Sequence, residues 1–230
     1  MRKVKGLPRR RPGRPARISR EAVVEAARRI VEAEGIDGLT MRRVADELGV
    51  VPMAIYRHVA RKDELVVLLV DAAYRELPEP LLPRMPRTRL IALWVFLHDG
   101  LAQFPWVVAA IVRSDIFAPS VLPKMDAILK ASVDCGLTIA QAGDAYRVVW
   151  QYTVGELMLR SAMLERMKAA APSMLVRTLL DVDPGALPTL AATARSWFSP
   201  PRFLTYEAGL QLVLDGVLPA PPRRVTRRER

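Results

Sequence analysis

The feature that most constrains the fold is the stretch of residues 39–62, LTMRRVADELGVVPMAIYRHVARK. Its apolar spacing predicts two short helices joined by a tight turn. Thr40 is placed to cap the first helix, Gly49 supplies the left-handed backbone that a sharp turn needs, and Pro52 suits the first position of a second helix. The stretch therefore predicts a helix-turn-helix.

The inner positions of this stretch have the side-chain sizes that a helix-turn-helix requires. The small Ala45 lets the second helix pack closely on the first, and the branched Ile55 seals the space between them. The other positions at the start of the second helix then face outward, at the end that enters the major groove of DNA. These positions are Val51, Pro52, Met53, Ala54, Tyr56 and Arg57.

Two spaced patterns follow each other in this region, T-x-x-x-V-A-x-x-L-G-V and Y-x-H-V-x-x-K-x-x-L. Together they resemble the DNA-binding end of the tetracycline-repressor (TetR/AcrR) family of transcription regulators, over residues 19–70. Near the end of the chain, YEAGLQLVLDGVL resembles the last helix of the tetracycline-repressor subgroup. The resemblance implies an all-α fold, with an N-terminal three-helix helix-turn-helix DNA-binding domain and a C-terminal helical bundle for ligand binding and dimerisation.

The net charge of +11 is concentrated at the front of the chain. Residues 1–62 hold 16 Lys and Arg against 7 Asp and Glu, a net of +9, whereas residues 63–222 hold 14 against 16, a net of −2. A near-neutral body with a basic front end is expected when one domain meets a polyphosphate. Solubilising charge, the alternative, would be scattered along the chain.

The first 20 residues contain nine Lys and Arg, no acidic residue and several prolines, a composition that favours a disordered arm. Within it, residues 9–15 (RRRPGRP) resemble the Gly-Arg-Pro core of an AT-hook, with Arg14 in the core. Two interpretations remain open. The arm either reads an A·T-rich minor groove through Arg14 or serves as a generic phosphate-binding tail.

Proline and glycine stops divide the remaining chain into helices, and no segment shows the alternation of a strand. Ser19 is expected to cap a first helix that ends at Gly35. Further helices are expected at residues 62–77, 87–104, 105–113, 120–135, 138–168, 172–180, 184–195 and 202–217. We expect four parts: a basic disordered arm (1–18), a helix-turn-helix DNA-binding domain (19–64), a helical regulatory and dimerisation domain (65–218) and a basic tail (219–230).

The resemblance assigns roles on DNA to several side chains. Arg42 corresponds to a family position that reaches a guanine edge, where a bidentate contact gives about 1–3 kcal/mol of discrimination. For Arg57, base readout and phosphate contact both remain open. Tyr56 and Lys62 match backbone-contacting positions, which orient the protein on DNA. His58 follows the family histidine and is expected to pack or to contact phosphate rather than to bind a metal.

The tip of the second helix departs from the more polar tips common in the family. Val51, Pro52, Met53 and Ala54 offer no side-chain donor or acceptor, so we expect them to contact thymine methyl groups. Thr40 and Arg14 complete the expected DNA-binding set.

The resemblance also implies a homodimer that reads a palindromic operator, joined by residues 138–168 and 202–217. Two identical reading heads are needed because one small helix-turn-helix buries too little surface for tight specific binding. Gly155 and Gly209 are expected to permit close approach of the two subunits.

A ligand pocket is implied between the helices of the C-terminal domain, and its expected occupant is a small apolar or aromatic effector. Taken alone, each candidate side chain is more typical of an ordinary core than of a ligand site. The candidates are Trp94, Leu97, His98, Leu101, Phe104, Trp106, Ile111, Phe117, Met125, Trp150 and Met158. Phe104 stands about where tetracycline-responsive members carry a histidine, which argues against a metal–tetracycline effector.

Other function classes find little support. The chain has no Gly-rich phosphate loop, no Cys/His cluster for zinc and no nucleophile elbow, so we expect neither an enzyme nor a bound cofactor or metal. A single cysteine, Cys135, is typical of a reducing cytoplasm. No membrane span is expected. The alternative is a sequence-tolerant architectural DNA-binding protein of the nucleoid type.

Overall fold

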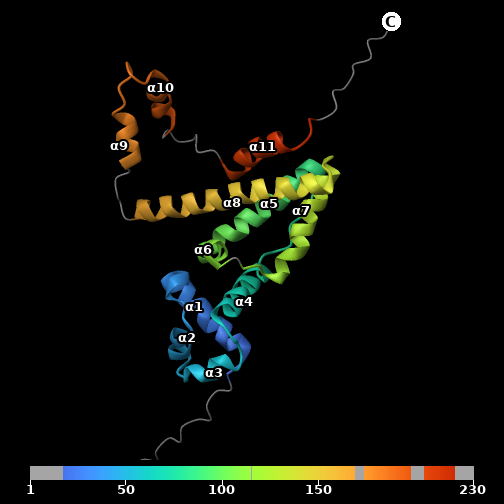
Figure 1. Cartoon of the computed structure of the whole chain (residues 1–230), viewed down its shortest axis with the longest axis vertical. Coiled ribbons are helices and arrows are strands. Elements are labelled where there is room, and N and C mark those ends of the chain that lie inside the picture. The colour runs from blue at the N-terminus through green and yellow to red at the C-terminus, as the bar shows by residue number, and fades with distance from the viewer. Residues whose placement is uncertain (1–17, 115, 169–173, 198–204, 221–230) are drawn as a thin grey trace, which may run out of the picture. The chain divides into compact units, whose positions relative to one another are not determined.

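A computed structural model describes residues 18–114, 116–168, 174–197 and 205–220 (Figure 1). Every regular element among these residues is a helix, which confirms the expected all-α fold. The chain divides into two compact units between Leu69 and Val70, inside a continuous helix.

The first unit is built from α1 (Arg20–Gly38), α2 (Met41–Leu48), α3 (Pro52–Tyr56) and the first part of α4 (Lys62–Arg75). Ser19 caps α1 as predicted, because its side chain accepts a hydrogen bond from the Ala22 N–H at 3.1 Å. Gly35 interrupts α1 with φ of 73°, a left-handed conformation that favours glycine. The core of this unit consists of Val23, Ala26, Ala27, Ile30, Val31, Leu39, Val44, Ala45, Ile55, Val59, Leu65, Val66 and Leu69.

The second unit continues α4 and adds the remaining helices. They are α5 (Pro86–Gln103), α6 (Pro105–Ser114), the short 3-10 helix η1 (Pro119–Val121), α7 (Leu122–Asp134), α8 (Ile139–Lys168), α9 (Met174–Leu180), α10 (Pro188–Trp197) and α11 (Tyr206–Val217). The long α8 packs against α5, α6, α7 and α11, and α9 packs against α10. The main core joins α5, α7, α8 and α11 around Leu90, Leu93, Trp94, Ile128, Val149, Leu210 and Leu214.

Two helix boundaries in this unit test the sequence predictions. No helix crosses the proline-rich stretch between the helices expected at residues 62–77 and 87–104, and the gap runs from residue 76 to residue 85. The helix expected from residue 184 begins instead at Pro188. The Asp183 carboxylate accepts a hydrogen bond from the Gly185 N–H at 2.9 Å and so holds a turn where the helix was expected.

Among the described residues, no single helix is long and apolar enough to cross a membrane. Only α5 and α6 taken together, bent by 100° at their junction, meet the requirements of length and composition.

Candidate functional site

The turn between α2 and α3 has the geometry that the sequence predicted. The Thr40 hydroxyl accepts a hydrogen bond from the Arg43 N–H at 3.0 Å and caps α2. Gly49 adopts φ of 66°, and the Val50 N–H donates to the Ala45 carbonyl at 2.9 Å. Pro52 occupies the first turn of α3. These contacts end α2 and redirect the chain within three residues, so α3 follows directly.

The short α3 separates its residues cleanly into an inner and an outer set. Ile55 is fully buried, whereas Val51, Met53 and Tyr56 are 69%, 68% and 47% exposed. Pro52 and Arg57 are also exposed, and Ala54 is half-buried. Large apolar side chains that are exposed together at the start of a helix are typical of a surface that contacts another molecule.

Several cations in this unit are held by carboxylates. The Arg43 guanidinium pairs with Glu34 at 2.9 Å and with Glu47 at 3.1 Å, and Arg29 pairs with Glu47 at 3.2 Å. Hydrogen bonds that Arg43 donates to Glu34 and Glu47 raise the pKa of Arg43, while the bonds donated by Arg29 and Arg43 lower the pKa of Glu47. These side chains are therefore already paired with each other within the protein.

Other cations beside α3 have no such partner. Within the part of the chain that the structure describes, the side chains of Arg42, Arg57, Arg61 and Lys62 make no ion pair or hydrogen bond, and all four are exposed. Cations of this kind suit phosphate contact, because no carboxylate competes for them. We call Arg42, Arg57, Arg61 and Lys62 the free cations.

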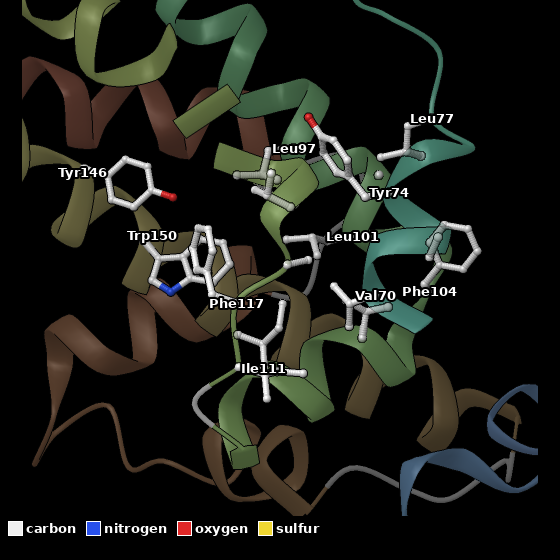
Figure 2. A pocket seen from close by; sticks show the side chains of 16 residues that line it. Val70, Tyr74, Leu77, Leu97, Leu101, Phe104, Ile111, Phe117, Tyr146 and Trp150 are labelled. Carbon is white, nitrogen blue, oxygen red and sulfur yellow. The ribbon is translucent and has the colours of Figure 1, made fainter. Parts of the chain in front are cut away.

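The second unit contains an apolar cavity of about 190 Å³ (Figure 2). Its walls come from α4, α5, α6, α8 and the segment that joins α6 to α7. They are formed by Val70, Ala73, Tyr74, Leu77, Leu97, Gly100, Leu101, Phe104, Val107, Ile111, Ile116, Phe117, Ala118, Val121, Tyr146 and Trp150. We call this cavity the pocket.

A buried carboxylate ties two walls of the pocket together. Asp71 of α4 is 7% exposed and accepts a hydrogen bond from the Ser120 N–H at 2.9 Å, and it also pairs with Arg75. Burial opposes ionisation of Asp71, but the bonds from Ser120 and the charge of Arg75 lower its pKa below the usual value. The charged carboxylate therefore fastens the start of η1 to α4.

Two family profiles cover most of the chain. Residues 23–69 match the one described as bacterial regulatory proteins of the tetR family, and residues 83–220 match the one described as the tetracyclin repressor-like C-terminal domain. This chain belongs to the TetR family. It is therefore a helix-turn-helix DNA-binding transcriptional regulator, which confirms the family predicted from residues 39–62.

Individual relatives agree with this assignment. The chain is 33% identical over 226 residues to the HTH-type transcriptional repressor DrrR1 of Streptomyces coeruleorubidus, covering 90% of this chain and 81% of DrrR1. ActR of Streptomyces coelicolor, solved in complex with actinorhodin, shares 22% identity and a TM-score of 0.73 over 88% of this chain and 96% of ActR. BioQ, solved with its double-stranded DNA operator, shares 24% identity and a TM-score of 0.62 over 87% of this chain and 98% of BioQ. The last two likenesses establish the fold.

Six of the ligand candidates line the pocket: Leu97, Leu101, Phe104, Ile111, Phe117 and Trp150.

The other candidates, Trp94, His98, Trp106, Met125 and Met158, do not line this pocket. Trp94 and Trp106 are buried in the core instead. Met158 lines a separate cavity of about 380 Å³ beside α5, α6 and α8, whose walls also include Arg160, Glu165 and Lys168.

His98 has a structural setting that explains its absence from the pocket. Its Nδ1 lies 2.8 Å from Asp99 Oδ1 and its Nε2 lies 2.8 Å from Glu156 Oε2. The imidazole stacks on Tyr206 at 3.8 Å between ring centroids, and the Tyr206 hydroxyl lies 2.8 Å from Thr153 Oγ1. These contacts link α5, α8 and α11, so both ring nitrogens are already used.

One wall of the pocket escaped the sequence predictions. Val70, Ala73, Tyr74 and Leu77 of α4 and its end follow the spacing i, i+3, i+4, i+7, which is a second apolar stripe on that helix. Tyr146 of α8 also lines the pocket and was not among the ligand candidates. The exposed Arg61 was not among the DNA-binding candidates. Arg14 lies outside the described residues.

Proposed function

We propose that this chain is a repressor that binds a palindromic operator as a homodimer and releases it when a small apolar or aromatic effector occupies the pocket. TetR-family membership and the relative DrrR1, a transcriptional repressor, support the regulatory role. The single observation that carries the proposal is the outward face of α3, where Val51 and Met53 are in water while Ile55 is fully buried.

Recognition of the operator combines two kinds of contact. Arg42 and Arg57 supply donors for guanine or phosphate, and Tyr56 and Lys62 hold the DNA backbone. The apolar tip contributes methyl contacts to thymines. Val51, Pro52, Met53 and Ala54 form that tip, with Thr40 and Arg14 as further contacts.

Dimerisation through α8 and α11 is supported by apolar side chains that the single chain leaves in water. Val148 and Leu159 of α8 are 44% and 72% exposed, and Leu212 of α11 is 65% exposed. A Cβ added at Gly155 would meet nothing within 4 Å, so a partner has room to approach there. Gly209, expected at the same interface, is buried inside the chain instead.

Release of DNA follows from differential binding. The pocket wall formed by Val70, Ala73, Tyr74 and Leu77 belongs to α4 and its end, and α4 begins at Lys62, one of the free cations. An effector that prefers one position of α4 changes operator affinity by no more than that preference. The bond from Ser120 to Asp71 fastens a second pocket wall to α4, which supports α4 as the element that moves. We also propose that the chain has the four parts expected from its sequence, which are divided after residues 18, 64 and 218.

The experiment is selection of binding sites from random duplex DNA with the purified chain, followed by a screen for compounds that release the selected site. A repressor is expected to prefer its best site over random DNA by about a thousandfold or more at physiological salt. Nearly equal affinities would instead support the architectural alternative. Release of DNA from a dimer that stays intact would support the effector mechanism, and release through dissociation of the dimer would contradict it.

A further inference from the structure

We infer that the effector is an uncharged aromatic molecule that carries a ketone-type acceptor facing Tyr146 and Trp150. This inference rests on the proposed function, since it names the class of molecule that the same pocket takes. The charge, the aromatic rings and the hydrogen-bonding groups of the pocket walls each lead to one part of it.

The charge of the effector follows from the walls. None of the sixteen lining residues is Asp, Glu, Lys, Arg or His. Moving a charged group into such a space leaves it without a counter-ion, which costs far more than burying a neutral group. The part of the effector inside the pocket is therefore uncharged, and a metal chelate has no side chain there to hold it.

The shape follows from the rings on the walls. Phe104, Phe117 and Trp150 offer flat faces for stacking. Phe117 is 50% exposed, which places the opening of the pocket beside it.

The acceptor follows from two polar groups on α8. Tyr146 and Trp150 are one helical turn apart and both line the pocket, and Figure 2 shows the Tyr146 hydroxyl directed toward the other lining side chains. Among the described residues, neither the Tyr146 hydroxyl nor the Trp150 indole N–H has a hydrogen-bond partner. The indole N–H can only donate. Burial raises the pKa of Tyr146, so its hydroxyl stays protonated and can donate as well.

Two donors lie on the α8 wall, and the one further polar side chain among the sixteen lining residues is Tyr74 on the α4 wall. One oxygen with two lone pairs matches the two donors on α8. A ketone carbonyl has this property and carries no charge, whereas a carboxylate has the lone pairs and the wrong charge. An alkyl group in the same place would exclude water from both donors and offer them no hydrogen-bond acceptor.

The test uses three probes of similar shape: 1-acetonaphthone, 1-ethylnaphthalene and 1-naphthoate. Dissociation constants are measured by isothermal titration calorimetry on the full chain at equal salt. We expect the ketone to bind about fivefold more tightly than the ethyl compound, and the carboxylate to bind at least about tenfold more weakly than the ketone. Equal binding of ketone and ethyl compound, tighter binding of the carboxylate, or binding of none of the three would overturn the inference.

Two variants test whether the Tyr146 hydroxyl causes the preference for the ketone. Tyr146→Phe removes only the hydroxyl and is expected to reduce the preference for the ketone over the ethyl compound to about twofold or less. Tyr152→Phe is the matched control on the same helix, because the Tyr152 hydroxyl donates to the Tyr206 carbonyl and does not line the pocket. An unchanged preference in Tyr146→Phe, or an equal loss in both variants, would contradict the assigned contact.

The outcome is separable from failure of the proposed function. Operator selection is measured without any probe, so a chain that fails to discriminate between duplexes disproves the regulator while probe binding is still measurable. A chain that selects an operator but releases it only for charged compounds keeps the regulator and disproves this class of effector.

Discussion

The two candidate sites differ in how they are assembled and in what they offer a ligand. The DNA-facing surface comes from residues 39–62, lies outside the core and presents the free cations. The pocket draws on five separate segments between Val70 and Trp150 and presents no charge at all. The free cations and the apolar pocket thus belong to different units, so we expect that each can be damaged without the other.

The largest difference between the effect on DNA binding and the effect on ligand binding is expected from Ile55→Ala. Ile55 is fully buried under α3, so the cavity should destabilise the first unit by about 2–5 kcal/mol and abolish operator binding. Binding of 1-acetonaphthone should change by less than about twofold, since this side chain does not line the pocket. Calorimetric titrations with DNA and with probe check both, and equal loss of the two activities would break the comparison.

A smaller effect is expected from removing one free cation. Lys62→Gln removes two phosphate contacts per dimer, so the slope of log affinity for the operator against log salt should fall in magnitude by about 1.8. Arg29→Gln is the control, because Arg29 is already paired with Glu47. A slope that changes equally in both variants would show that ion pairing within the fold does not decide which cations meet DNA.

Asp71→Ala should cost stability and weaken the link between pocket and α4. It leaves the Ser120 N–H without its acceptor, which costs about 1–3 kcal/mol near neutral pH. Because the folded-state pKa of Asp71 is lowered, this contribution is present above the ordinary pKa of 3.8 and is lost as pH falls below it. Denaturant unfolding at pH 7 and pH 3 measures the difference, which should shrink at the lower pH. Ligand-induced release of DNA should also be weaker in this variant.

The smallest effect is expected from Tyr206→Phe. The lost hydrogen bond to Thr153 should cost about 1 kcal/mol of stability. Affinity for DNA and for 1-acetonaphthone should stay within about twofold, because the network around His98 is structural. A pronounced change in ligand affinity would place that network in the effector site.

The sequence predicted the turn between α2 and α3 better than the walls of the pocket, for a physical reason. Thr40, Gly49 and Pro52 act on neighbouring residues, so their effects can be judged without knowing the rest of the fold. The pocket depends on which face of each apolar helix turns inward. Trp94 and Leu97 are both buried on α5, yet only Leu97 reaches the pocket, and nothing in their spacing distinguishes them.

The central claim is that an exposed α3 reads base edges as one of an identical pair. Site selection from random DNA with the purified chain tests it most directly. We predict one palindromic motif with thymines opposite the apolar tip, half-sites separated by about 10 base pairs or a multiple, and an affinity at least about a thousandfold above random DNA. A pool that remains random after repeated rounds would contradict it.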